Sequence, residues 1–374
     1  MKHYKRWIIN NYKNLRGWRN ERKIVVIESD DWGSIRMPSK EVYQKLLNIG
    51  IRVDKCPYNK YDSLANEEDL EKLFELLSLF KDKNGNPPVI TANCVVANPD
   101  FDNISKNNFS KYYFEPFTET LLRYPRHTKS FSLWCEGIKS KIFIPQFHGR
   151  EHLNVLRWMK NLKLGSKETK IAFDNKFFGL STTITSEKRG SYMAAFDFDH
   201  PDEIAYHKQV IKEGLQIFEK IFGYKSESFI APNGVWHPLL EETLYANGVK
   251  YIQGGGQKVP SMSGAKTLFK PLGSFNEFDQ LFLMRNASFE PSARPFIDSV
   301  EHCLKDISRA FFYKKPAVIS SHRLNFIGNI EPKNRDYNLK EFKKLIKKIV
   351  TRWPDVEFMT SDQLGRLISE NKTK

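Results

Sequence analysis

Short apolar segments typical of buried strands alternate with helical segments along most of this 374-residue chain, and this alternation limits the fold more than any other feature. Apolar segments predict strands at residues 24–27, 89–97, 143–147, 228–231, 251–253, 281–285, 317–320 and 356–359. Amphipathic periodicity and end signals predict helices at residues 39–48, 66–80, 201–222, 238–247, 297–312 and 339–352. Alternation of this kind favours a parallel sheet. No glycine-rich dinucleotide loop follows the first strand, so we expect a parallel α/β barrel rather than an open doubly wound sheet.

Two regions interrupt the alternation. Residues 100–139 are irregular and rich in aromatic side chains, and we expect them to cross the top of the core with one or two helices. Residues 173–199 have no clear periodicity. We therefore predict a basic N-terminal helix at residues 1–22, a barrel domain at residues 23–374, and an enlarged loop region between the first and third strands.

Composition limits the partners and the compartment. The formal net charge of +15 favours anionic partners such as acidic glycans or phospholipid head groups. No arginine-rich tract or RNA-binding motif accompanies this charge, and we expect no nucleic-acid partner. The four cysteines are scattered, which favours free thiols in a reducing compartment. No signal peptide and no apolar run of about 20 residues is present, so we expect a cytoplasmic protein.

The first 22 residues allow two interpretations. Trp7, Ile8, Tyr12, Leu15 and Trp18 interleave with lysines and arginines. A basic helix with this pattern can rest on an anionic membrane surface, which would place the protein at the inner membrane face. The alternative, which we favour, is a helix that packs against the base of the barrel.

Polar residues gather where predicted strands end. Asp30 and Asp31 follow the first strand, and two carboxylates in tandem are costly unless a cation or a proton lies between them. His148 and His152 are spaced i and i+4, which places them on one face if the segment is helical. One Asp with two His is a sufficient ligand set for a catalytic divalent metal. Because working residues of barrels sit at the C-terminal ends of strands, His322 after a late strand joins this group.

Four segments together resemble the metal-dependent polysaccharide deacetylases, which include chitooligosaccharide and peptidoglycan deacetylases. Residues 28–32, Glu-Ser-Asp-Asp-Trp, resemble the family's Thr-Phe-Asp-Asp-Gly. Residues 148–152, His-Gly-Arg-Glu-His, resemble His-Ser/Thr-x-x-His. Residues 229–234, Phe-Ile-Ala-Pro-Asn-Gly, and 320–322, Ser-Ser-His, resemble Phe-Arg-Pro-Pro-Tyr-Gly and Leu-x-His. The resemblance extends over about residues 23–364, and the order of the motifs is more specific than any single motif.

This resemblance implies a fold and a metal site. The fold would be the family's distorted (β/α)7 barrel. Asp31, His148 and His152 would hold a divalent metal ion, usually zinc. Asp30 would be the general base that activates a water molecule, and the metal would polarise the acyl carbonyl.

The resemblance also implies roles for two further residues. The backbone N–H of Asn233 would replace that of the family's tyrosine as an oxyanion donor, and His322 would protonate the leaving amine or alkoxide. This chain departs from the family pattern at Ile230, where the family has arginine, and at Gly149 and Ser320. These departures leave the metal ligands intact and put the acyl pocket in doubt.

The missing arginine steadies the catalytic Asp in the family, and another residue must replace it here. Arg150, Arg285 and Arg36 are candidates. We favour Arg285, because it ends a predicted strand.

Three other residues are candidates for the cleft. Glu290 follows a predicted strand as a supporting acid, an acid catalyst or a plain loop residue. Trp236 and Trp32 each lie beside a motif and are candidates for stacking on a sugar or for covering a loop.

The sequence therefore predicts a metal-dependent carbohydrate deacetylase that removes an acetyl group from nitrogen or oxygen. Its substrate would be an acetylated carbohydrate, acidic or lipid-linked, in surface polysaccharide metabolism. Two alternatives remain: a glycoside hydrolase that uses Asp30 or Asp31 with Glu290, and a catalytically degraded barrel that only binds glycans.

Overall fold

Parallel strands form the centre of the molecule. The computed structural model describes residues 11, 13–186, 191–262 and 265–371. Within these residues nine strands form one sheet in the order β10-β7-β6-β5-β2-β1-β12-β11, and β13 also pairs with β1. All pairs in this sheet are parallel. The strands are β1 (Ile24–Trp32), β2 (Ile90–Val95), β5 (Phe143–Gly149), β6 (Ser228–Phe229), β7 (Tyr251–Ile252), β10 (Leu281–Phe282), β11 (Ala287–Ser288), β12 (Ala317–His322) and β13 (Glu357–Met359).

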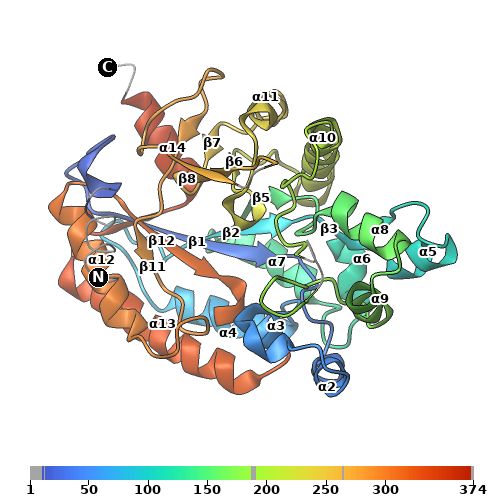
Figure 1. The fold of residues 1–374 in the computed structure, drawn as a ribbon. Helices are drawn as coiled ribbons and strands as arrows, with labels where there is room; N and C mark the ends of the chain where they lie inside the picture. Colours follow the sequence, from blue (N-terminus) through green and yellow to red (C-terminus); the bar gives the residue numbers. More distant parts are fainter. Residues whose placement is uncertain (1–10, 12, 187–190, 263–264, 372–374) are drawn as a thin grey trace.

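The sheet is curled and helices surround it, which confirms the predicted α/β barrel architecture (Figure 1). In the part of the chain described, β10 and β11 are the ends of the strand order and do not pair, so the barrel is open between them. The larger helices are α2 (Lys40–Asn48), α4 (Glu67–Ser78), α7 (Ser130–Lys139), α8 (Val155–Lys163), α9 (Lys167–Asp174), α10 (Glu203–Phe222), α12 (Ser299–Phe312), α13 (Pro332–Arg352) and α14 (Ser361–Glu370). No helix among the described residues is long and apolar enough to cross a membrane.

Helix α4 shows how local sequence sets these elements. Asn66 caps its N-terminus, and the side chains of Asn66 and Asp69 each accept the other's backbone N–H in a capping box. Leu70, Leu73 and Leu77 form its buried stripe and contribute to the core between the sheet and the helices. The sequence signals for this helix are thus satisfied in the fold.

Strand β1 is buried over its whole length, as expected for a central parallel strand. Its side chains alternate between two hydrophobic clusters: Val25 and Ile27 belong to one, and Ile24 and Val26 to the other. The same alternation directs Glu28 and Asp30 to one side of the sheet, because successive side chains point to opposite faces.

The region between the first and third strands is more regular than expected. Residues 100–139 contain three helices, α5 (Phe101–Lys106), α6 (Phe117–Leu122) and α7, where one or two were expected. They also contain β4 (Phe114–Pro116), which pairs antiparallel with β3 (Ala97–Pro99). A second antiparallel pair, β8 (Gly256–Val259) and β9 (Lys266–Phe269), follows β7, and short helices α3 (Pro57–Tyr61) and α11 (Glu241–Ala246) complete the list.

Half of the predicted N-terminal helix, residues 1–10 and 12, lies outside the described residues. In the described part helical structure ends at residue 15, and residues 16–22 are not helical, so the prediction of a helix up to residue 22 is wrong at this end. The described part contacts the N-terminal ends of the strands. The Nζ of Lys315, just before β12, donates to the carbonyl oxygens of Arg16, Gly17 and Trp18 at 2.8, 2.5 and 2.6 Å. Arg22 forms an ion pair with Glu357 at 2.6 Å. Residues 16–22 therefore rest on the base of the barrel, opposite the ends that carry the candidate site.

Candidate metal and catalytic site

Polar side chains from the C-terminal ends of several strands line one cleft of about 450 Å³. The parallel register contributes directly, since Asp30 of β1 lies opposite His322 of β12. The cleft is lined by Asp30, Asp31, Arg36, Tyr58, His148, His152, Ser181, Ser191, Met193, Ile230, Ala231, Asn233, Gly234, Trp236, Gln253, Gly254, Gly256, Lys258, Arg285 and His322. Residues from distant parts of the sequence thus meet where a barrel places its working groups.

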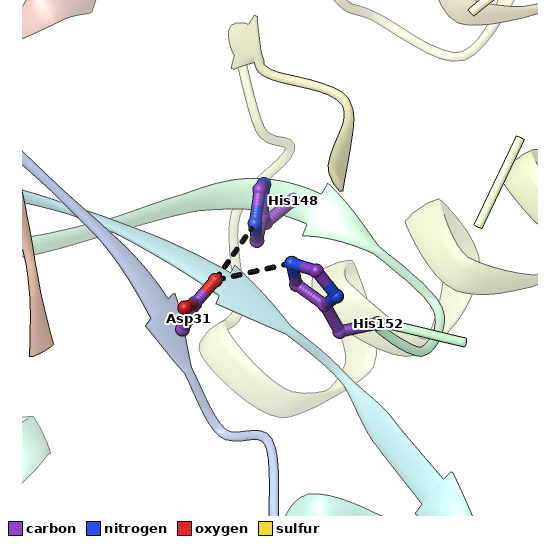
Figure 2. Close-up of side chains that lie close together, drawn as sticks. All are labelled: Asp31, His148 and His152. Carbon is purple, nitrogen blue, oxygen red and sulfur yellow. Dashed lines mark hydrogen bonds and ion pairs between the residues drawn. The ribbon is translucent and has the colours of Figure 1, made fainter. Parts of the chain in front are cut away.

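Asp31, His148 and His152 converge in this cleft (Figure 2). The Oδ1 of Asp31 lies 3.3 Å from Nε2 of His148 and 3.2 Å from Nε2 of His152. One ligand atom from each residue lies within 4.8 Å of the other two, and all three residues are buried. This is the only such grouping of His, Cys, Asp and Glu side chains found among the described residues.

The hydrogen bond on the far side of His148 fixes which of its ring nitrogens faces Asp31. Nδ1 lies 2.8 Å from the carbonyl oxygen of Ile230. A carbonyl only accepts, so Nδ1 carries the proton, and the lone pair of the neutral ring is on Nε2. That lone pair faces a carboxylate oxygen, an arrangement that needs a proton or a cation between the two atoms.

The three side chains therefore fit a divalent metal ion. Two imidazole nitrogens and one carboxylate oxygen are a common donor set for zinc and similar ions, and they leave coordination positions for water and substrate. The Ile230 carbonyl is the kind of partner that orients a metal-binding histidine. Burial lowers the pKa of His152, which favours the neutral ring that ligation requires.

His148 and His152 do not share a helix, so the condition under which their spacing would place them on one helix face is not met. His148 lies on strand β5, and His152 lies in the loop before α8 begins at Val155. Asn154 caps α8 by accepting the N–H of Arg157, and its Nδ2 donates to the carbonyl oxygen of Asp197 at 2.6 Å. A strand end and a pinned loop, rather than one helix face, bring the two rings together.

The end of β1 has an unusual backbone. Asp31 has φ of 74°, which non-glycine residues adopt at a cost of about 1 kcal/mol or more. The strand turns at Asp31, so that the carboxylates of both Asp30 and Asp31 line the cleft, although successive side chains of a regular strand point to opposite faces. Burial would raise the pKa of Asp31, but the neighbouring His152 and His148 hold that pKa well below its usual range.

Asp30 is held by Arg285 in two hydrogen bonds. Nη1 donates to Oδ2 at 2.6 Å and Nη2 to Oδ1 at 2.7 Å, and Asn93 adds a third donor at 2.7 Å. Burial opposes ionisation of Asp30, yet the charge of Arg285 lowers the pKa of this carboxyl below its usual value. Arg285 follows β10, so the arginine favoured from the sequence is the one that contacts Asp30; Arg150 pairs with Glu151 instead.

His322 and Glu290 form a second pair of oppositely charged side chains in the site, beside the pair of Asp30 and Arg285. His322 Nδ1 lies 2.6 Å from Oε1 of Glu290, and Asn325 donates to the other oxygen of Glu290 at 2.9 Å. Nε2 of His322 lies 3.8 Å from Oδ2 of Asp30. Burial would lower the pKa of His322, but the charge and hydrogen bond of Glu290 raise it to about 10. The imidazole is therefore protonated at neutral pH.

Two further predicted site residues, Asn233 and Trp236, line the cleft. Asn233 lines the cleft with φ of 57°, and its carbonyl accepts a hydrogen bond from Lys258 at 3.1 Å. Trp236 forms part of the wall, and its Nε1 donates to Glu241 at 3.1 Å. Both positions agree with a role in the cleft without testing it.

One prediction needs correction. Trp32 does not reach the cleft: it is 1% exposed and packs edge-on against Phe143 at 4.8 Å between ring centroids. Its position after the turn of β1 directs the ring into the core, so it cannot stack on a sugar. For Glu290 the structure agrees with the interpretation as a supporting acid. Glu290 is not among the lining residues, and its two oxygens face His322 and Asn325. It supports His322 rather than a substrate.

Three interior residues of the site were missed from the sequence. Glu28, at 0% exposed, accepts hydrogen bonds from Arg285 Nε and from Ser361 at 2.7 Å. Asn93 and Gln253 donate to each other's amide oxygens at 2.8 and 3.0 Å. The signal for Glu28 was present, because an acidic residue inside an apolar strand needs a buried cationic partner. Nothing in the sequence marks the amide pair.

Comparison with known proteins finds similarity only at the level of structure. Neither a protein-family model nor a curated protein sequence matches this chain. Similar solved structures include 4-alpha-glucanotransferase from Thermococcus litoralis, at 11% identity and TM-score 0.44, with coverage of 91% of this chain and 40% of that chain. Puue allantoinase has 11% identity and TM-score 0.44, with coverage of 93% and 91%. Peptidoglycan deacetylase PdaC from Bacillus subtilis has 11% identity and TM-score 0.35, with coverage of 94% of both chains.

This chain thus spans 40% of the length of the glucanotransferase. At identities near 11% and TM-scores below 0.5, these similarities add nothing to the functional argument. The function has to be inferred from the site itself.

Proposed function

We propose that this protein is a metal-dependent hydrolase that removes an acyl group, such as acetyl, from a carbohydrate. The observation that carries the proposal is the convergence of Asp31, His148 and His152, with the lone pair of His148 turned toward the carboxylate. An ionised Asp30 and a protonated His322 line the same cleft. A metal site, a proton acceptor and a proton donor together suit hydrolysis of an amide or an ester.

Asp31, His148 and His152 would hold the metal ion, and we propose zinc. When bound, the ion supplies Lewis acidity that polarises the acyl carbonyl and lowers the pKa of a water molecule. Asp30 is a weak base because Arg285 keeps its pKa low. A weak base can take a proton only from a water molecule whose own pKa is lowered, and the metal ion would lower it.

Asp30 would accept the proton of the attacking water and, through Arg285, stay fixed in orientation. His322 would donate its Nε2 proton to the leaving nitrogen or oxygen, since Nδ1 is engaged by Glu290. The backbone N–H of Asn233 would stabilise the negative charge that develops on the acyl oxygen. Trp236 would contribute an apolar wall for the substrate.

The position of Glu290 argues against the glycoside hydrolase alternative. That reaction needs two carboxyl groups on either side of a glycosidic bond. Glu290 does not line the cleft, and its charge is committed to His322. A degraded glycan-binding barrel also fits poorly, because the acid–base groups remain complete and Arg285 compensates for the arginine that Ile230 replaces.

We further propose that the protein acts in the cytoplasm on a precursor of a surface polysaccharide. All four cysteines are free thiols, as expected in a reducing compartment. Contact of residues 1–22 with a membrane stays a prediction, because residues 1–10 and 12 lie outside the described part.

A metal and acetate assay tests the proposed function. The purified protein should contain about one divalent ion per chain and release acetate from N- or O-acetylated sugars, and a chelator should abolish release until metal is restored. His148→Ala should lose the metal and at least about 100-fold of the activity. His200→Ala is the matched control, because His200 is exposed and remote from the ligand set. Acetate release that survives complete removal of metal would refute the proposal.

A further inference from the structure

Arg36 is a buried arginine whose guanidinium faces the cleft. It follows the turn after β1 and is 6% exposed, and it is among the lining residues. Its Nε donates to Oδ1 of Asn59 at 2.8 Å, and Asn59 is fixed by a bond to the carbonyl of Gly179 at 2.9 Å. The guanidinium carbon lies 5.7 Å from the centroid of the Tyr58 ring. Neutral groups thus hold the side chain in place.

Arg36 differs from the other buried arginines in forming no ion pair among the described residues. The buried carboxylate of Asp62 is near enough for the charge of Arg36 to act on it, but Asp62 pairs with Arg323. The remaining four buried arginines all form ion pairs with Asp or Glu: Arg150, Arg157, Arg323 and Arg335. Burial of an unpaired charge is unfavourable because the charge loses its hydration, and proteins normally avoid it. Because no described carboxylate pairs with Arg36, its position at the cleft points to an anionic partner that enters the cleft.

The charges around the cleft favour a negatively charged partner. Asp30 and Asp31 line the cleft, and Glu28 and Glu290 lie behind it. Four cations, Arg36, Arg285, Lys258 and His322, line the same cleft and match these four carboxylates. A divalent ion on Asp31, His148 and His152 would leave the whole site net positive.

We propose that Arg36 forms an anion-binding subsite that recognises a carboxylate or phosphate group on the substrate beside the acyl group. The planar guanidinium binds such groups through parallel N–H donors, and Asn59 and Tyr58 preorganise it for this. The proposal rests on the proposed function and narrows its substrate class to anionic carbohydrates. It assigns Arg36 to substrate binding rather than to Asp30, which Arg285 already contacts.

Three substrates that differ in charge test the subsite. They are N-acetylglucosamine 1-phosphate, N-acetylglucosaminuronic acid and the neutral methyl N-acetylglucosaminide, each assayed with the metal-loaded protein. Binding of the three compounds is measured in parallel by titration calorimetry. We expect one of the two anionic compounds to exceed the neutral one about tenfold or more in kcat/KM and in affinity, and which of them does so identifies phosphate or carboxylate.

Variants at Arg36 then assign the preference to this residue. Arg36→Met should remove the preference, mainly through a higher KM, and Arg36→Lys should retain part of it because it keeps the charge. Arg52→Met is the matched control: Arg52 is exposed, pairs with Asp54 and does not line the cleft, so the preference should persist. Metal content and thermal unfolding of each variant show that the fold is intact, and Arg36→Lys covers the case in which Arg36→Met does not fold.

The outcomes separate this inference from the proposed function. Metal-dependent hydrolysis with no preference for either anion would overturn the subsite and leave the function standing. A preference that persists in Arg36→Met and Arg36→Lys would also overturn it. Absence of hydrolysis, together with anion binding that is lost in the Arg36 variants, would support the subsite and count against the proposed function.

Discussion

Single residues in this protein gain their chemical character from one or two neighbours. Asp30 and Glu28 flank the same guanidinium, so that the largely enclosed Arg285 makes two buried carboxylates tolerable. Asp31 has no arginine and faces imidazole rings instead, which turns a similar carboxylate into a candidate metal ligand. Adjacent aspartates therefore serve two different purposes.

Removal of the negative charge behind His322 gives a prediction at this scale. In Glu290→Gln the pKa of His322 should fall, because Glu290 provides the main interaction that raises it. His322 must be protonated to act as a proton donor, so the alkaline limit of kcat should move to lower pH by about one unit or more. The pH profile of kcat measures this shift. An alkaline limit that does not move would show that His322 is not the proton donor.

At the scale of elements, the loops after the strands decide the geometry of the site. Gly149 at the end of β5 has φ of 133°, which lets the chain leave the strand and return with His152. The capped start of α8 then fixes the other end of this loop. The position of the loop with His152 therefore depends on the cap that Asn154 provides to α8.

Loss of that cap should weaken the metal site. Asn154→Ala removes the acceptor for the N–H of Arg157 and the donor to Asp197, and should cost about 1–2 kcal/mol of stability. Because the loop with His152 loosens, metal affinity should fall about tenfold or more. Competition with a chelating dye measures the affinity.

The matched control for this prediction is Asp298→Ala. Asp298 caps α12 through the N–H of Glu301 and lies outside the cleft, so this variant should lose similar stability and keep its metal affinity. Equal metal affinity in wild type and Asn154→Ala would show that the loop is held by other contacts.

For the whole molecule, buried titratable groups outside the site contribute to the response to acid, and His207 is one of them. His207 of α10 is buried against Phe196, and its Nδ1 has no hydrogen-bond partner within the described residues. Burial lowers the pKa of His207 to about 4 from the usual 6.5. The unfolded chain therefore binds a proton at a higher pH than the folded chain does.

This difference predicts a loss of stability as pH falls. The contribution of neutral His207 is fully present above pH 6.5 and disappears as the pH falls to about 4. The size of the effect is about 3 kcal/mol. Urea unfolding of chelator-treated protein from pH 7 to 4 measures it, and the chelator removes the contribution of metal release. His207→Leu should lose this part of the slope, whereas exposed His200→Leu should retain it; equal slopes in all three proteins would contradict the assignment.

The sequence by itself determined the architecture and the residues nearest to the chemistry. Strand and helix periodicity predicted the parallel α/β barrel, since burial of apolar faces depends on local pattern. The tandem aspartates and the His spacing marked the residues that meet in the cleft. Arg285 was favoured because it ends a predicted strand, and working residues of barrels lie at strand ends. The roles of all these residues stay proposals.

Tertiary structure alone decided how these groups are used. Backbone angles and packing that no local pattern encodes decide three features of the site. They set the path of the loop after β5, the burial of the Trp32 ring in the core, and the position of Glu290 behind His322. The same holds for Arg36: that it forms no ion pair with any described residue depends on all the elements around it, which no single segment of sequence reveals. Contacts between residues hundreds of positions apart are set by the cooperative packing of the barrel, and these contacts decide the chemistry of the cleft.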